Sequence, residues 1–302
     1  MTDSGLTGFS HDQFDPITQS GDETYRSGFV TIVGRPNVGK STLLNRILGQ
    51  KVSIVSNKPQ TTRNQIRGVL TQPESQIVFI DTPGIHKAKT ALGERLNDAA
   101  NEAIGDVDAI VFVIDGTKPF GRGDQYISDR LPKGAVLVVN KADKISKAQM
   151  FEQLRLAGPM DFAAYFPISA TKGTGIDVLV NHLVKLMPFG PQYYPDDMVT
   201  DVEEAFWVAE LAREQLFALM GEELPYSVAC VVTEWEWPRI RIEVFVERES
   251  QKGIVIGKGG DVLKKVGTAV RAQLPDGAFV ELFVRVDPNW QRSPKALARL
   301  GY

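Results

Sequence analysis

The chain is poor in cysteine and histidine. Its 302 residues include one cysteine, Cys230, and three histidines, His11, His86 and His182. A single cysteine excludes an internal disulfide and is typical of a reducing cytosol. The histidines are scattered and show no metal-ligand spacing, so the sequence predicts no zinc site. Cys230 lies in the apolar stretch Ser227–Val232, which favours an inert core thiol over a nucleophile.

Long apolar runs and export signals are also missing. No run approaches the roughly 20 apolar residues needed to cross a bilayer, so we expect no membrane-spanning segment. Residues 1–27 carry five acidic residues and neither a basic nor an apolar segment. This pattern predicts a solvated polar tail rather than a signal peptide. Together with the scarcity of cysteine, these features predict a cytoplasmic protein.

Charge is unevenly distributed along the chain. The formal net charge is −3, yet residues 251–302 hold nine Lys and Arg against four Asp and Glu. A basic end on an acidic protein favours an anionic partner for that end, although a solvated charged face is the simpler alternative. The 43% of hydrophobic and 24% of charged residues are otherwise typical of a globular protein, and the length suits two domains.

Through residues 28–188, short apolar runs typical of buried strands alternate with helical patterns. This alternation predicts an α/β domain with a mostly parallel, doubly wound sheet. The predicted strands are Phe29–Val33, Gln76–Ile80, Ala109–Ile114, Ala135–Val139 and Tyr165–Ile168, with Gln65–Leu70 as an antiparallel edge strand.

A proline-rich linker, residues 189–198, separates this domain from a smaller one, residues 199–302. The order of elements changes beyond the linker, and the new order is typical of a mixed α+β domain. The predicted elements are a helix Val199–Met220, strands Tyr226–Glu236 and Arg239–Glu247, a short helix, a helix Asp261–Leu274 and a strand Phe279–Val286.

A phosphate-binding loop of the pattern GxxxxGK[ST] follows the first predicted strand and opens a helix. Its glycines let backbone N–H groups turn toward phosphate oxygens, and the helix N-terminus adds positive potential. We expect Lys40 to reach the outer phosphates and Ser41 to ligate Mg²⁺. Taken alone, the loop has a ligand-free glycine turn as its alternative. The predicted nucleotide contacts are Gly34, Arg35, Pro36, Asn37, Val38, Gly39, Lys40, Ser41 and Thr42.

Three further motifs follow other predicted strands, and ligands of open parallel sheets bind at the carboxyl ends of the strands. Asp81 is placed to hold Mg²⁺ through water, and the Gly84 N–H to sense the γ-phosphate. The Asp143 carboxylate accepts two hydrogen bonds from guanine, and adenine lacks this pair of donors, so we expect GTP over ATP. The motifs are Asp81-Thr82-Pro83-Gly84, Asn140-Lys141-Ala142-Asp143 and Ser169-Ala170, the last offering a backbone N–H to the guanine oxygen.

With these motifs in this order, the N-terminal part resembles the translation-factor class of small GTPases. The resemblance implies a switch loop at residues 60–63, in which a threonine binds Mg²⁺ only in the GTP state. Thr62 is favoured over Thr61, but the sequence does not decide between them. The implied Mg²⁺ ligands are Ser41, Thr62 and Asp81, and the implied catalytic residues are Lys40, Thr62, Gly84 and Asn37.

The residue after the Asp-x-x-Gly motif is Ile85, where Ras-like enzymes carry a glutamine. Isoleucine neither orients nor polarises water, so we expect slow intrinsic hydrolysis. The sequence is similar to GTPases with a hydrophobic residue here, and in several of these an asparagine of the phosphate loop helps to bind K⁺. Asn37 occupies that position. The alternative is that Asn37 only favours the geometry of the turn.

In the second domain a glycine loop joins two predicted helices after two strands. A GxxG loop of this kind clamps single-stranded RNA backbone in KH domains, because glycines let phosphates approach the chain. Alone it is a weak signal, but it lies within the basic end of the chain. The predicted RNA contacts are Ile256, Gly257, Lys258, Gly259, Gly260 and Lys264.

A GTPase domain followed by a type II KH domain resembles the Era family of bacterial GTPases, from about Gly28 to Tyr302. The resemblance implies GTP or GDP with Mg²⁺ as ligand, 16S ribosomal RNA near its 3′ end and the 30S subunit as partners, and no obligate oligomer. Peripheral contact with the inner face of the cell membrane is a further expectation. The residues themselves leave two alternatives open: a metabolic or signalling enzyme with a protein-binding C-terminal domain, and a membrane-surface switch.

Overall fold

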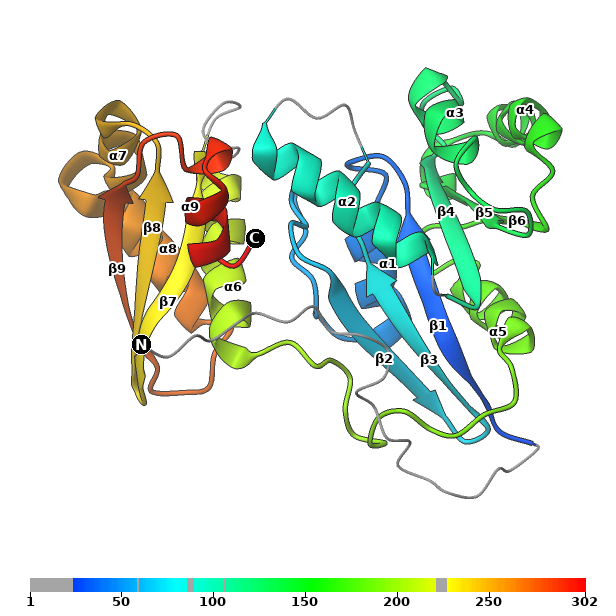
Figure 1. The fold of residues 1–302 in the computed structure, drawn as a ribbon, viewed down its shortest axis with the longest axis horizontal. Helices are drawn as coiled ribbons and strands as arrows, with labels where there is room; N and C mark the ends of the chain where they lie inside the picture. Colours follow the sequence, from blue (N-terminus) through cyan, green and yellow to red (C-terminus); the bar gives the residue numbers. More distant parts are fainter. Residues whose placement is uncertain (1–23, 59, 86–89, 106, 221–226) are drawn as a thin grey trace.

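The computed structural model describes residues 24–58, 60–85, 90–105, 107–220 and 227–302, so most of the predicted N-terminal tail and His86 lie outside the described residues. Two sheets lie side by side in Figure 1, each with its own helices. In the described part of the chain, no helix is both long and apolar enough to cross a membrane.

The larger sheet has the strand order β2-β3-β1-β4-β5-β6. All neighbouring strands are parallel except β2 and β3, which are antiparallel, so β2 is the predicted antiparallel edge strand. The predicted fold class is confirmed. The strands are β1 (Arg26–Val33), β2 (Ile66–Gln72), β3 (Ser75–Asp81), β4 (Ala109–Asp115), β5 (Val136–Asn140) and β6 (Ala164–Pro167).

Helices cover both faces of this sheet. Apolar residues of α1 and α5 pack on one face, and residues of α2, α3 and α4 pack on the other. The strands between them are buried on both sides and are therefore apolar at nearly every position. The helices are α1 (Lys40–Leu48), α2 (Ala91–Gly105), α3 (Arg122–Ser128), α4 (Lys147–Ala157) and α5 (Ile176–Leu186).

The smaller sheet has the order β7-β8-β9, in which β8 is antiparallel to β7 and parallel to β9. Alternate residues of β8 face the helices and form the core of this domain with α6, α7 and α8. Cys230 is part of this core, as predicted, and burial raises the pKa of its thiol to about 12. The elements are α6 (Glu204–Leu219), β7 (Ala229–Glu236), β8 (Arg239–Val246), α7 (Glu249–Ile256), α8 (Asp261–Arg271) and β9 (Phe279–Val286).

Two helix boundaries differ from the prediction. The helix expected from Val199 begins at Glu204, because the preceding backbone pairs with β2: the Val69 N–H donates to the Val199 carbonyl at 2.8 Å. The helix expected to reach Leu274 ends at Arg271. Pro275 disfavours helical backbone in the residue before it, which accounts for the earlier end.

An apolar cluster joins the two domains. The short helix α9 (Pro294–Arg299) lies between the small sheet and α2 in Figure 1. Trp290 is fully buried in the cluster, and its Nε1 donates to the Ser227 carbonyl at 3.1 Å. The members are Leu92 and Leu96 from α2, Ala229 from β7, and Trp290, Ala296, Leu297 and Leu300.

Truncating Leu297 tests this cluster. The side chain is 0% exposed, so Leu297→Ala leaves a cavity and should lower the free energy of unfolding by about 2–5 kcal/mol. Urea unfolding followed by tryptophan fluorescence measures the change. Phe151→Ala is the control, because Phe151 is 69% exposed and its loss should stay within about 0.5 kcal/mol. A Leu297→Ala change as small as that of the control would contradict the packing.

Candidate nucleotide site and RNA-binding loop

The phosphate loop connects the end of β1 to the start of α1. Gly39 has a left-handed φ of 101°, and a Cβ there would lie 2.3 Å from the Asn140 amide nitrogen, so the loop requires glycine. The Lys40 ammonium donates to the carbonyls of Gly34 and Arg35 at 3.2 and 3.3 Å, across the mouth of the loop. Burial lowers the pKa of Lys40 to about 8, and attraction to Asp81 opposes that shift.

Other residues of the loop reach neighbouring segments. The Arg35 guanidinium forms an ion pair with Asp124 of α3 at 3.1 Å. Asn37 has a left-handed φ of 66°, consistent with a role in the turn, and its amide donates to the Asn57 carbonyl at 2.6 Å. Pro36, Ser41 and Thr42 line a cavity together with the switch-loop residues Gln60, Thr61 and Thr62. The phosphate loop and the switch loop therefore line the same cavity.

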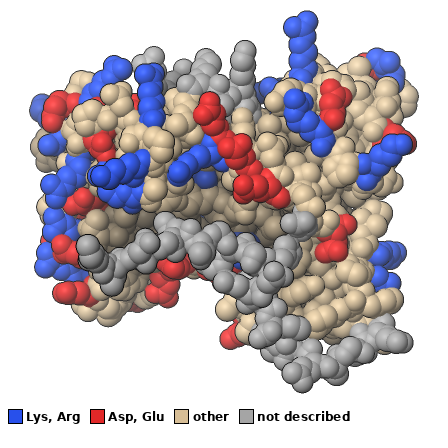
Figure 2. Space-filling view, in the orientation of Figure 1, with Lys and Arg blue, Asp and Glu red and all other residues tan. Residues whose placement is uncertain are grey.

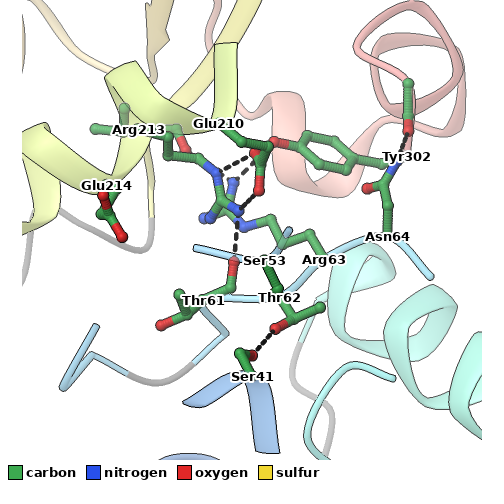
Figure 3. Close-up of polar contacts among 12 residues, drawn as sticks. Ser41, Ser53, Thr61, Thr62, Arg63, Asn64, Glu210, Arg213, Glu214 and Tyr302 are labelled. Carbon is green, nitrogen blue, oxygen red and sulfur yellow. Dashed lines mark hydrogen bonds and ion pairs between the residues drawn. The ribbon is translucent and has the colours of Figure 1, made fainter. Parts of the chain in front are cut away.

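Three hydroxyl groups converge on the Asp81 carboxylate at the end of β3. Ser41 and Ser53 donate to Asp81 Oδ2 at 2.8 and 2.9 Å, and Thr62 does so at 3.4 Å. The hydroxyls of Ser41 and Thr62, which point toward each other in Figure 3, are within hydrogen-bond distance at 3.0 Å. Thr62 is buried, whereas the Thr61 hydroxyl turns away and donates to the Lys58 carbonyl at 2.6 Å. Of the two threonines, Thr62 alone lies in this cluster.

The cluster fits a divalent cation with oxygen ligands. Asp81 is 0% exposed, and its Oδ1 accepts no hydrogen bond from the described residues. Burial raises the pKa of Asp81, against the opposing effects of Lys40 and the hydroxyl hydrogen bonds. A carboxylate that is buried at such a cost, with an unpartnered oxygen and hydroxyl groups beside it, is suited to Mg²⁺.

The remaining residues of the Asp-x-x-Gly segment pack closely. The Thr82 hydroxyl is committed to the fold and donates to the Ile32 carbonyl at 2.9 Å. At Gly84 a Cβ would lie 2.8 Å from the Pro36 nitrogen, so only glycine permits this approach to the phosphate loop. Pro83 is buried beside it. Ile85 is 6% exposed and belongs to the apolar core, so it presents no polar group to the site.

At the other end of the site, the Asn140 amide joins three loops. Its Nδ2 donates to the Val38 carbonyl of the phosphate loop at 2.9 Å, and its Oδ1 accepts from the N–H groups of Lys141 and Ala170 at 2.7 and 3.0 Å. The Ala170 N–H is therefore already bonded, and binding a guanine oxygen would require it to be shared. Lys141 extends to the Asn37 carbonyl at 3.0 Å.

Asp143 is the exposed member of this end of the site. Its Oδ1 accepts a hydrogen bond from the Ser169 hydroxyl at 2.6 Å, and this bond lowers the pKa of the carboxyl group. The carboxylate is therefore ionised and fixed in direction while remaining open to solvent. These are the properties needed to accept two hydrogen bonds from one edge of a base.

Sequence reasoning missed three side chains that support the site. Ser53 is fully buried and holds Asp81, and Asn45 of α1 fixes its position by accepting from the Ser53 N–H at 3.0 Å and donating to the Ser53 carbonyl at 2.7 Å. Asp115 at the end of β4 pairs with Lys141 at 2.6 Å. Asp115 follows an apolar run, as Asp81 does, and this pattern could have identified Asp115 from the sequence. Ser53 belongs to no recognisable motif, so the sequence offers no comparable signal for it.

The glycine loop of the second domain connects α7 to α8, as predicted. Gly257, Gly259 and Gly260 all have left-handed φ values, of 77°, 62° and 82°. Nothing lies within 4 Å of a Cβ built at Gly259 or Gly260, so another chain can approach the backbone there. Lys258 and Lys264 are exposed and Ile256 is half-buried. Figure 2 shows Lys and Arg side chains gathered on the side of the molecule that holds α7 and β9.

Two known families match the two domains. Residues 29–141 match the family described as 50S ribosome-binding GTPase. Residues 223–291 match the KH domain family. The first match contains the phosphate loop and the segment that ends at Lys141, and the second contains the GxxG loop. The sequence motifs and the families therefore agree domain by domain.

Comparisons over the whole chain give the same result. The GTPase Era of Halothermothrix orenii is 43% identical over 292 residues, which cover 92% of this chain and 99% of that protein. A crystal structure of Era with MgGDPNP and nucleotides 1506–1542 of 16S ribosomal RNA has a TM-score of 0.88 at 38% identity. A point variant of Aquifex aeolicus Era bound to GDP and aluminium fluoride has a TM-score of 0.85 at 37% identity. Each covers 92% of this chain and 99% of its own. The chain therefore belongs to the Era family of GTPases.

Proposed function

We propose that this GTPase acts in the maturation of the 30S subunit and binds 16S ribosomal RNA near its 3′ end through its KH domain. One observation carries the proposal: a phosphate loop bonded to the segment that contains Asp143 and an open GxxG loop occur in the same chain. The related Era that crystallised with MgGDPNP and nucleotides 1506–1542 of 16S ribosomal RNA supports both ligands. A cytoplasmic location follows from this partner, and the basic end is the feature that would serve a peripheral membrane contact.

In this proposal the nucleotide lies along the carboxyl ends of the strands. Backbone N–H groups of residues 37–42 and the Lys40 ammonium hold the phosphates, because Lys40 is already buried at the mouth of the loop. Asp143 selects guanine, with Ser169 fixing the carboxylate and Ala170 facing the guanine oxygen. The Asn140 and Lys141 side chains hold the base end against the phosphate loop.

Mg²⁺ fits the cluster of Ser41, Thr62 and Asp81, and when bound it would neutralise charge on the phosphate oxygens. In this proposal the Gly84 N–H senses the γ-phosphate. Ile85 is buried and supplies no group to orient the attacking water, so the intrinsic rate is slow. Positive charge beside Asn37 would compensate for this, and K⁺ is the proposed source.

Replacing Asp143 by asparagine tests base selection. The Asp143→Asn variant loses the acceptor pair for guanine, so its GTP affinity should fall about 100-fold, while affinity for xanthosine triphosphate rises because the new amide donor meets the xanthine carbonyl. Equilibrium titration with labelled nucleotides measures both affinities. The control is Asp177→Asn, which removes an exposed carboxylate of α5. Unchanged GTP affinity in the Asp143 variant would refute the assignment.

Reversing the charge of Lys258 tests RNA binding. Lys258→Asp places a carboxylate where phosphate should approach, so the Kd for a 16S 3′-end RNA in a gel shift should rise about tenfold or more. Lys133→Asp makes the same change at an exposed position between α3 and β5 and should leave the Kd unchanged. If both variants bind RNA as the wild type does, the glycine loop is not the RNA site.

Comparing salts tests the potassium proposal. GTP turnover should be roughly threefold or more faster in KCl than in NaCl at equal ionic strength, because a bound cation stabilises charge that develops on the phosphates. Asn37→Ala should remove the difference. Phosphate release gives the rates. Equal turnover of the wild-type protein in the two salts would contradict the potassium proposal and favour a role of Asn37 in the turn geometry only.

A further inference from the structure

We propose that Arg213, a residue of the KH domain, is a positioning residue for the GTPase reaction: it fixes the Thr61 carbonyl and thereby holds Thr62 in the Mg²⁺ site. Arg213 lies on α6, and its Nη2 donates to the Thr61 carbonyl at 2.5 Å, as Figure 3 shows. The inference rests on the proposed role of Thr62 and adds a residue outside the GTPase domain to the same site.

The Arg213 guanidinium is buried and paired within its own helix. The residue is 0% exposed, and Glu210, one turn earlier on α6, neutralises it through a bond from Nε at 2.7 Å and a second bond from Nη2. Among the described residues, the Thr61 carbonyl is the only hydrogen-bond acceptor of Arg213 outside its own helix. A buried charge that is already paired within one domain therefore donates a further hydrogen bond to the switch loop of the other domain.

The same turn of α6 also holds the start of a longer stretch, residues 55–63, which ends in the switch loop and is called the switch segment below. Glu214 accepts from the Val55 N–H at 2.9 Å and pairs with Lys51 at 2.5 Å. Residues 213 and 214 therefore contact the segment before and after the stretch 56–60. Both contacts are made to backbone atoms of the segment, so they constrain its path whatever its side chains do.

On the far side of Thr62, Arg63 extends into the KH domain. Its guanidinium donates to the Val228 carbonyl at 2.8 Å and to the Tyr302 hydroxyl at 3.2 Å, and lies over the Trp290 ring at 5.5 Å. Thr62 thus lies between two residues that are both anchored in the KH domain, and its own hydroxyl points the opposite way, toward Ser41. Contacts with the KH domain therefore fix the backbone on both sides of Thr62, while the Thr62 hydroxyl contacts Ser41 of the GTPase domain.

This arrangement predicts a dependence on the γ-phosphate. Switch loops are ordered by contacts of the γ-phosphate and Mg²⁺, so a looser Thr62 should weaken the binding of a GTP analogue and leave GDP binding unchanged. By linkage, the GTP analogue should in turn strengthen the docking of the KH domain by the same factor. General damage to the fold would weaken both nucleotides alike.

The test replaces the buried pair together, because removing one partner would leave a buried charge. The Glu210→Leu/Arg213→Met variant fills the site with apolar side chains of similar volume. It removes the bonds between Glu210 and Arg213 and, of the hydrogen bonds described above between this pair and the GTPase domain, the one to Thr61. Lys51→Ala is the matched control, since it removes contacts with Glu214 and Gln273 of the KH domain without touching the Thr61 carbonyl. Affinities for GDP and for GDPNP with Mg²⁺, and hydrogen exchange of residues 60–64 in the nucleotide-free protein, are measured for each.

For the double variant we expect GDPNP affinity to fall roughly tenfold, GDP affinity to stay unchanged, and residues 60–64 to exchange faster than in the wild type. The inference is overturned if GDPNP affinity stays within about twofold of the wild type, if GDP and GDPNP affinity fall in parallel, or if Lys51→Ala reproduces the loss. Wild-type protein that fails to bind GDPNP would instead refute the proposed function itself.

Discussion

The geometry of the nucleotide site depends on one side-chain amide. Asn140 bonds to the phosphate loop at Val38, to the backbone of its own motif and to Ala170 of the next loop, and it is 3% exposed. Replacing it would leave these buried backbone groups unpaired, at about 1–3 kcal/mol each. Because the parallel strands deliver all three loops to one edge, a single amide can fix the distance between the phosphate and base ends. The sheet brings the three loops close together, and the hydrogen bonds of Asn140 hold them in one site.

The switch segment depends on the second domain in the same physical way. Its backbone is bonded at Val55 and Thr61 to α6, while the apolar cluster around Leu297 and Trp290 holds the KH domain against α2. The glycine loop lies at the far end of that domain, between α7 and α8, and stays open to solvent. Docking therefore leaves the proposed RNA-binding loop accessible while it constrains the proposed Mg²⁺ site. The two proposed ligands bind to separate surfaces that are connected by buried contacts.

Much of this could be predicted from sequence, because the informative signals are local. Apolar runs located the strands, and the motifs that follow them located the phosphate and base loops. The signals failed where a distant segment decides the outcome. The start of α6 is displaced by pairing of Val199 with β2, and Ser53 holds Asp81 only because Asn45 fixes its backbone. In the sequence Arg213 is indistinguishable from other polar helix residues, because its partner, the Thr61 carbonyl, lies 152 positions away.

The central claim is that one guanine nucleotide is held at both ends by the loops that Asn140 connects. Competition at equilibrium tests it most directly: GTP and ATP are titrated against a fluorescent guanine nucleotide bound to the wild-type protein with Mg²⁺. The account predicts that GTP displaces the probe at concentrations about 10⁴-fold below those of ATP, since adenine cannot satisfy Asp143. Displacement by ATP at the same concentrations as GTP would contradict it.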